Sequence, residues 1–171
     1  MHRRRLLGAI GLDGFGLTLL IHILTIAGID VTLPFPYVWA MHAAVIVNFA
    51  SAMLLLVHAG YPGRLTLDIL QDNLPAWVLL TDGLFFAYMF INLFLCISVT
   101  KGGNAEIVNG QYLLVSHAHV LAHLTEHEYQ LHKAYELRMF SGGWLLFWAW
   151  STSYFLFWKH VPIRSTNRLL A

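Results

Sequence analysis

Charged residues are scarce in this chain. Of its 171 residues, only 11% are Asp, Glu, Lys or Arg, whereas 58% are hydrophobic. An ordinary soluble domain has about 25% charged residues, and a soluble fold of this size could not hide so much apolar surface. The shortage of charge therefore argues against a soluble protein and indicates an integral membrane protein.

Cysteine is nearly absent, and so is any excess of charge of one sign. Cys96 is the single cysteine, which excludes an intramolecular disulfide. A formal net charge of +1, with the basic residues at chain ends and in loops, argues against a nucleic-acid partner. The sequence also lacks a P-loop, a nucleophile triad, a catalytic carboxylate pair and a CxxC motif, so nothing in it indicates an enzyme.

Long hydrophobic runs, by contrast, are abundant. The hydrocarbon core of a bilayer is about 30 Å thick and is crossed by about 20 helical residues. Four stretches are long enough, and they are residues 6–29, 37–60, 75–99 and 142–161. We therefore expect residues 1–171 to form one all-α membrane domain, an antiparallel bundle of four transmembrane helices.

Lysine and arginine are unevenly divided between the two ends of these helices. Seven lie on one side, namely Arg3, Arg4, Arg5, Arg64, Lys159, Arg164 and Arg168, and three on the other, namely Lys101, Lys133 and Arg138. Positively charged loops stay in the cytoplasm. We therefore expect both termini on the cytoplasmic side of a plasma (inner) membrane, with the segment between the third and fourth helices outside.

The expected external loop, residues 100–141, carries structural signals of its own. Asn109-Gly110 between two apolar runs predicts a β-hairpin. Thr125 and Glu128 have the spacing of a capping box, which predicts a short helix starting directly after Thr125. A Ser-Gly-Gly break at residues 141–143 should then separate this short helix from the fourth span.

Half of the ten histidines fall within residues 116–132 and raise the question of a metal site. If residues 111–123 are extended, three of these histidines project to one face, because side chains alternate along a strand. Neutral imidazole ligates both Zn and Cu, and the candidate ligands are His117, His119, His123 and His127. The alternatives are a loop whose histidines face water, headgroups or a neighbouring subunit, and a pH-sensing cluster.

Polar residues within the spans form a second candidate site. Such residues are costly in lipid unless they are paired or liganded. We expect them to form a buried polar network that holds the helices together, and its members are Asp13, Asn48, Asp82 and Asn92.

Two histidines within the spans suggest a cofactor. From a rise of 1.5 Å per residue, His22 and His42 both lie about 6–8 Å below the outer membrane edge. One imidazole from each of two facing helices is the requirement of bis-histidine ligation, and neighbouring polar groups could orient the rings. The hypothesis is an axial pair for haem b or another tetrapyrrole, and a quinone-type pocket is a further alternative.

These observations leave three functions open. The favoured one is a small non-catalytic accessory subunit of a larger membrane complex, for example an electron-transfer or photosynthetic assembly. It would bind partner membrane subunits, or further copies of itself, through the aromatic-rich fourth helix (142–161) and the external loop. The alternatives are a redox carrier with haem at His22 and His42, and a metal-binding membrane protein that uses the external histidines.

Overall fold

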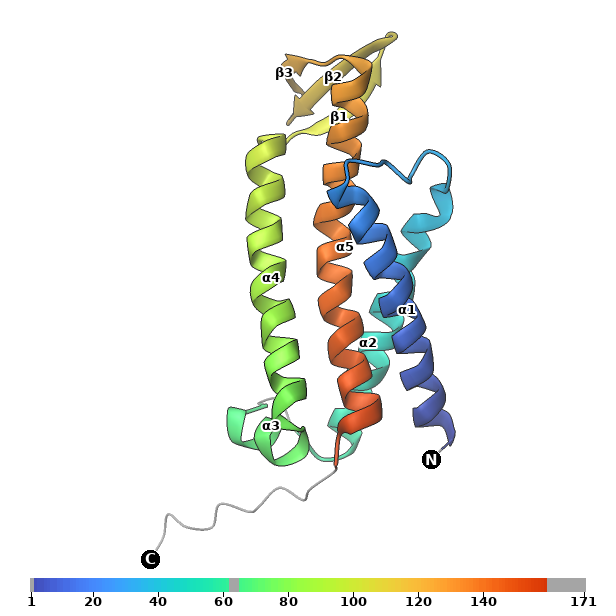
Figure 1. Ribbon diagram of the computed structural model, residues 1–171, viewed down its shortest axis with the longest axis vertical. Helices are drawn as coiled ribbons and strands as arrows, with labels where there is room; N and C mark the ends of the chain where they lie inside the picture. The colour runs from blue at the N-terminus through green and yellow to red at the C-terminus, as the bar shows by residue number, and fades with distance from the viewer. Residues whose placement is uncertain (1, 62–64, 160–171) are drawn as a thin grey trace, which may run out of the picture.

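The computed structural model describes residues 2–61 and 65–159, and helices dominate it (Figure 1). Four long helices run side by side, namely α1 (His2–Ile26), α2 (Ala40–His58), α4 (Ala76–Thr100) and α5 (Glu126–Phe157). The shorter elements are the 3-10 turn η1 (Pro36–Trp39), α3 (Leu67–Asn73), and the strands β1 (Asn104–Val108), β2 (Gln111–Ser116) and β3 (His119–His123). Three residues of the charge count, Arg64, Arg164 and Arg168, and positions 160–161 of the expected fourth span lie outside the described residues.

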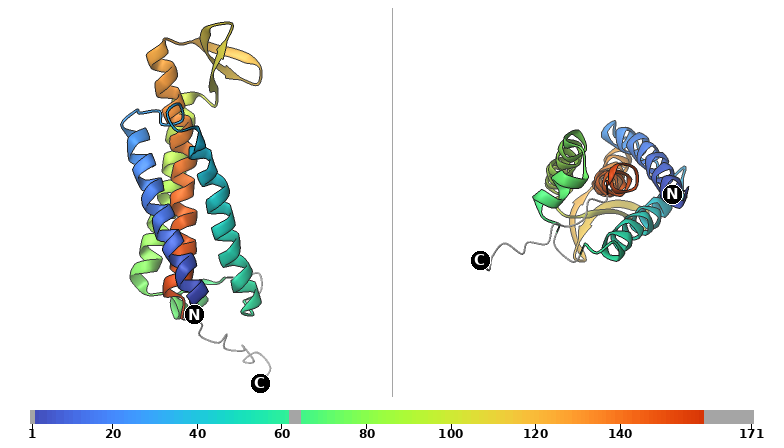
Figure 2. Two further views of the ribbon diagram at one scale, coloured as in Figure 1. Left: turned by 90° about the vertical axis from the view of Figure 1, so that its right-hand side faces the viewer. Right: turned by 90° about the horizontal axis from the view of Figure 1, so that it is seen from below.

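Helix α5 is the centre of the molecule. Helices α1, α2 and α4 each pack against it, and the view along the bundle shows them arranged around it (Figure 2). Gly11 and Gly14 of α1 allow a close approach to α5, because a Cβ at these positions would lie 2.4 Å from Thr152 Oγ1 and 2.6 Å from the Trp148 ring. The expected antiparallel bundle is therefore built as three helices around one, and α1 and α2 are antiparallel but contact each other less than they contact α5.

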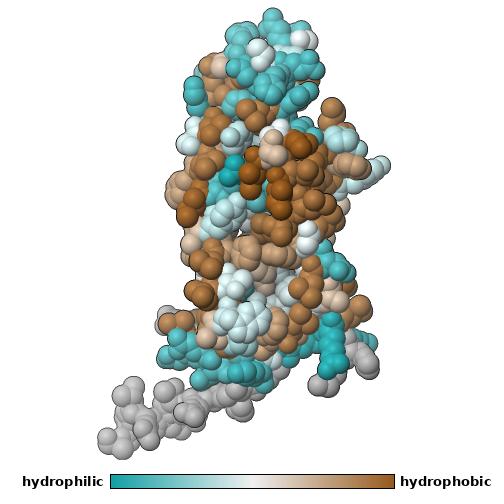
Figure 3. Space-filling view, in the orientation of Figure 1, coloured by the Kyte–Doolittle hydropathy of each residue, from teal (hydrophilic) through white to brown (hydrophobic). Residues whose placement is uncertain are grey.

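Three helices are long and apolar enough to cross a membrane, as expected for a membrane protein. They span Arg3–Ile26, Pro36–His58 and Ala76–Thr100, close to the first three expected spans. Exposed leucine, isoleucine and phenylalanine side chains cover their outer surfaces, and Figure 3 shows this apolar zone between hydrophilic ends. Among the described residues, α5 is not a fourth candidate span, because its mean hydropathy is too low although it is long enough. Its tryptophans, serines and glycines lower its mean hydropathy, and most of them are enclosed by the other helices.

The expected break at residues 141–143 is wrong, because α5 runs without interruption for 32 residues. The capping box is confirmed: Thr125 accepts from the backbone of Glu128, and the Glu128 side chain accepts from the backbone of Thr125. Gly142 lies inside the helix and does not end it. The absence of a side chain there allows α4 to pack closely, since a Cβ at this position would lie only 2.4 Å from Asn92 Nδ2. The expected short external helix and the expected fourth span are thus one rod.

The segment between α4 and α5 forms a small antiparallel sheet in the order β1-β2-β3. The hairpin at Asn109-Gly110 is confirmed, with φ values of 51° and 77° that suit a two-residue turn. A second turn, with His117 and Ala118 also at positive φ, adds the third strand, which the sequence did not predict. The sheet lies over the first turns of α5, where the Glu136 side chain accepts from the backbone N–H of Ala105 (2.6 Å).

The expectation that three external histidines share one strand face is wrong. His117 lies in the turn rather than on a strand. In β3, His119 pairs with Ser116 and His123 pairs with Leu113. Directly paired residues lie on the same face of a sheet, and positions 113 and 116 are on opposite faces of β2 because side chains alternate. A register shift opposite Leu114/Val115 therefore turns the two histidines to opposite faces.

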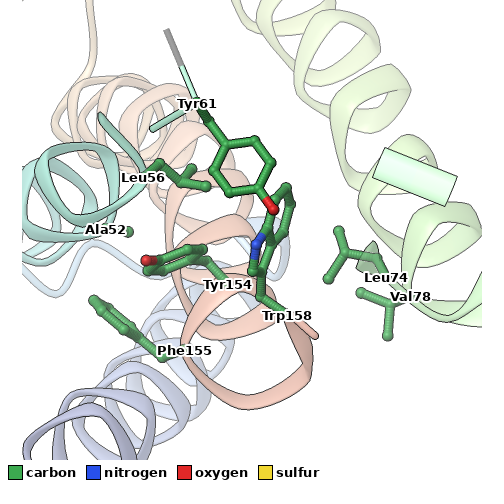
Figure 4. Close-up of a cluster of buried hydrophobic side chains, with 8 residues drawn as sticks. All are labelled: Ala52, Leu56, Tyr61, Leu74, Val78, Tyr154, Phe155 and Trp158. Carbon is green, nitrogen blue, oxygen red and sulfur yellow. The ribbon is translucent and has the colours of Figure 1, made fainter. Parts of the chain in front are cut away.

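Two clusters of buried apolar side chains stabilise the bundle. One joins α1, the loop after it, α2 and α5 near the sheet end and includes Val45 and Trp148. The other lies near α3 and joins α2, α4 and α5, where the rings of Tyr61 and Trp158 meet edge to face at 5.3 Å (Figure 4). Tryptophans belong to both clusters, Trp144 and Trp148 of α5 to the first and Trp158, directly after α5, to the second.

Candidate functional site

His22 is the most enclosed histidine among the described residues, only 2% exposed. Its Nδ1 lies 2.8 Å from Ser141 Oγ on α5, and its Nε2 lies 2.5 Å from the Tyr88 hydroxyl on α4. A neutral imidazole has one donor and one acceptor nitrogen, so both are used in this arrangement. His22 therefore connects three helices by hydrogen bonds.

Asn92 lies next to this histidine and links α4 to α5 by two hydrogen bonds. Its Nδ2 donates to the backbone carbonyl of Arg138 (3.0 Å), and its Oδ1 accepts from Arg138 Nε (2.9 Å). A Cβ built at Gly142 would touch both Asn92 and His22 Cε1, the latter at 3.5 Å. Asn92 and His22 thus belong to one polar cluster. We call it the His22 cluster, and its members are His22, Tyr88, Asn92, Arg138 and Ser141.

His42 belongs to α2 and contacts α5 at other residues than His22 does. Its Nδ1 accepts from Trp144 Nε1 (2.9 Å), and its ring meets Phe140 edge to face at 5.9 Å. His22 instead contacts Ser141, which precedes Trp144 by three residues, just under one helical turn. In this structure each histidine has hydrogen-bonding partners of its own, Ser141 and Tyr88 for His22 and Trp144 for His42. No ring nitrogen of His22 is left for iron unless Tyr88 or Ser141 is displaced.

The four residues expected to form one polar network do not form one. Asn48 donates to Ser151 Oγ (2.8 Å), and Asp82 accepts from Ser153 Oγ (3.0 Å). With the Asn92 contact, these are separate attachments of α2 and α4 to successive turns of α5. The fourth member, Asp13, is not buried at all, because its side chain is on the outer face of α1.

The exposed position of Asp13 is unusual for a helix apolar enough to span a membrane. Seven residues separate it from Leu6, where the first expected span begins. At 1.5 Å per residue this is about 10 Å, well inside a hydrocarbon core of about 30 Å. Its carboxyl makes no hydrogen bond or ion pair with the residues that the structure describes. Gly16, one turn further along this outer face, has no atom of the chain within 4 Å of a built Cβ.

The external histidines are not gathered at one point. Within residues 2–61 and 65–159, no group of three or more His, Cys, Asp or Glu side chains is arranged to hold a metal ion. His117 Nδ1 lies 3.0 Å from Ser116 Oγ, His119 and His123 lie on opposite sheet faces, and His127 is in the first turn of α5. The geometry therefore gives the Zn or Cu hypothesis no support.

One feature of the site was not predicted from the sequence. A cavity of about 440 Å³ lies between α2, α3, α4 and α5, with Asp82 in its wall. The signal that could have indicated it is the pair Asp82-Gly83, a polar side chain next to a residue without one. Neither residue by itself indicates which face of α4 is turned toward the other helices, so the sequence alone did not predict the cavity.

Comparison of the chain with protein-family models, with curated proteins and with solved structures gives no significant match. The function must therefore be argued from the arrangement of the residues alone.

Proposed function

We propose that this protein is a small non-catalytic subunit of a larger membrane assembly. In this proposal it binds a helix of a different membrane protein through the outer face of α1. The single observation that carries the proposal is the exposed carboxyl of Asp13 within a helix that is long and apolar enough to span a membrane. Ionisable residues within membrane spans almost always face protein or a water-filled cavity rather than lipid.

The neighbours of Asp13 support a helix as the partner. Gly16 lies one turn away with open space around it, and Leu17 and Leu20 on the same face are 50% and 55% exposed. Small residues allow the backbones of two membrane helices to approach closely, and polar side chains then bond across the contact. A partner helix that crosses over Gly16 would cover Asp13.

The chemistry of Asp13 also indicates what the partner helix carries. A second copy of this chain packed on the same face about a two-fold axis would bring two Asp13 carboxyls together, which disfavours ionisation of both. A lysine, arginine, histidine or hydroxyl group at the same depth would instead satisfy the carboxyl. A heterologous partner is thus favoured over a homodimer on this face.

The partner surface proposed here differs from the one expected on the fourth helix. Trp144 and Trp148 of α5 and Trp158 directly after it are at most 5% exposed and pack within the chain. We propose that α5 crosses the membrane as a fourth span, shielded from lipid by α1, α2 and α4. The basic residues near the start of α1 support a cytoplasmic location for that end, and the sheet would then lie outside.

The experiment is affinity purification of the full-length tagged chain from its native membranes in mild detergent. We expect the wild type to carry one other membrane protein in a constant ratio. Asp13→Leu and Gly16→Leu should weaken this association about tenfold, as expected for one lost interhelical hydrogen bond or a blocked close contact. Asp13→Asn keeps a hydrogen-bonding group and should retain part of it.

Two control variants separate assembly from folding. Gly83→Leu on α4 adds the same side chain as Gly16→Leu at another position with nothing within 4 Å. Ile91→Ala removes an exposed apolar side chain, 64% exposed, from α4. Both should purify with the partner at the wild-type ratio. A wild-type protein that is monomeric or binds only further copies of itself, or a complex that survives both α1 substitutions, would contradict the proposal.

A further inference from the structure

The cavity beside Asp82 is a separate feature from the outer face of α1. It lies near the α3 end of the bundle, and α2, α3, α4 and α5 all contribute to its wall. Its volume of about 440 Å³ is in the range of small-molecule sites, which are usually about 300–1,000 Å³. Helices α2 and α4 both pack on α5, and the cavity occupies the space between them.

Most of the cavity wall is apolar and aromatic. The rings of Phe86 and Trp150 lie nearly parallel, with centroids 6.3 Å apart, and both line the cavity. Leu56, Tyr154 and Trp158 line it near α3, where Figure 4 shows them together. Such a wall favours a hydrocarbon body over a polar or charged one.

The cavity opens at the surface of the apolar helices. Gly83 and Phe86 of α4 and Leu67 of α3 line the cavity and are themselves exposed, Phe86 by 45% and Leu67 by 63%. Gly83 contributes no side chain, and a Cβ built there meets no atom within 4 Å. In a bilayer this side faces the lipid chains, so a ligand would enter from the membrane.

Asp82 is the carboxyl side chain in this wall. Its Oδ1 accepts from Ser153 Oγ at 3.0 Å, and within the described part of the chain its other oxygen has no partner. A few polar groups in a mostly apolar pocket fix the orientation of a ligand. The Asp82–Ser153 pair is therefore an anchor for one polar group.

A hydroxyl is the headgroup that this anchor fits best. A hydroxyl both donates and accepts hydrogen bonds, so it can bind an ionised carboxylate as donor and a protonated carboxyl as acceptor. A carboxylate headgroup would be repelled by ionised Asp82, and a plain hydrocarbon would leave the carboxyl oxygen unpaired. We infer that the cavity binds a lipid-soluble molecule with a long hydrocarbon body and a neutral hydroxyl headgroup, which Asp82 holds by a hydrogen bond.

The test uses the full chain in phosphatidylcholine nanodiscs and three photoreactive probes of equal chain length, namely a fatty alcohol, a fatty acid and an alkane. Cross-linked residues are mapped by peptide mass spectrometry at increasing probe concentrations. We expect saturable labelling by the alcohol at cavity residues of α4 and α5. The acid and the alkane should label these residues more weakly, at the level of exposed residues such as Ile91.

Three variants make the result decisive. Gly83→Leu adds a side chain to the cavity wall, at a position where a Cβ meets no atom within 4 Å, and should abolish the saturable labelling. Gly16→Leu should leave the labelling unchanged. Asp82→Leu should weaken apparent affinity for the alcohol about tenfold, the effect of one hydrogen bond to a carboxyl group, and Asp82→Asn should largely restore it. The inference is overturned if labelling is non-saturable and insensitive to Gly83→Leu, or if the alkane labels the cavity as well as the alcohol does.

Discussion

The two adjacent glycines in the middle of α5 should respond to alanine in opposite directions. Gly142 is buried, and a Cβ there would lie 2.4 Å from Asn92 Nδ2 and 3.2 Å from Asn92 Cγ. Gly143 is half-buried, and a Cβ there would meet nothing within 4 Å. Both lie well inside a continuous helix, so the gain in helix propensity from Gly to Ala, about 1 kcal/mol, applies to both.

The contact with Asn92 decides the sign at Gly142. Its amide cannot move away freely, because it holds Arg138 by two hydrogen bonds of 3.0 and 2.9 Å. Overpacking a tight site costs about 1–3 kcal/mol, and each interhelical hydrogen bond lost adds about 0.6–1.7 kcal/mol. After subtracting the propensity gain, we expect Gly142→Ala to destabilise the protein by about 2 kcal/mol. Gly143→Ala should stabilise it by up to about 1 kcal/mol.

The assay is reversible unfolding of the full-length protein in mixed micelles, followed by circular dichroism for the wild type and both variants. Gly143→Ala serves as the matched control, since it makes the same chemical change one residue along. If Gly142→Ala stabilised the protein as much as Gly143→Ala, the close packing of α4 on α5 at Asn92 would be refuted. Equal stabilisation by the two substitutions is also what a helix broken at these glycines would give, so that result would contradict the continuous helix as well.

Two further predictions concern the His22 cluster and the start of α5. Tyr88→Phe removes the hydroxyl that contacts His22 Nε2 and should lower the free energy of unfolding by about 1 kcal/mol. The control is Tyr37→Phe, at an 86% exposed residue, which should leave the free energy of unfolding unchanged. Equal effects of the two substitutions would mean that the Tyr88–His22 contact is not stabilising. The pKa of the Glu128 carboxyl is lowered by the hydrogen bond from the Thr125 backbone and then by the bond from the Thr125 side chain. A carboxyl with a lowered pKa in the folded state stabilises the protein above its unfolded pKa of about 4.3 and loses this effect as the pH falls through the lowered value. The stability difference between wild type and Glu128→Gln, read by thermal melts from pH 7 downward, should therefore shrink below about pH 4, and a difference independent of pH would contradict the cap.

Local signals in the sequence predicted the local features of the fold. Hydropathy located three helices to within a few residues of their observed bounds. The Asn109-Gly110 turn and the capping box at Thr125 depend on neighbours two or three residues away, and both are confirmed. Such features need no knowledge of the rest of the chain.

Features set by contacts between distant segments were predicted wrongly or missed. Gly142 looked like a helix breaker because its partner, Asn92, comes from another helix. The register shift between β2 and β3, which separates His119 from His123, is likewise fixed by pairing rather than by alternation.

The rotation of each helix explains the remaining differences. Asp13 and Asp82 occupy spans of similar hydropathy, yet Asp82 faces Ser153 of α5 and Asp13 faces outward. A helix that is apolar on nearly all sides gives no moment from which its rotation can be read. The candidate sites at Asp13 and Asp82 therefore required the structure.

Site-specific photocross-linking in intact membranes tests the central claim most directly. A photoreactive residue is placed at Leu17 on the Asp13 face of α1 or, as a control, at Ile91 on α4; both native side chains are at least 50% exposed. We predict one discrete cross-linked membrane protein from position 17, lost when Asp13→Leu is added, and only lipid adducts from position 91. Lipid adducts alone at both positions, or a protein cross-link at position 17 that persists with Asp13→Leu, would contradict the account.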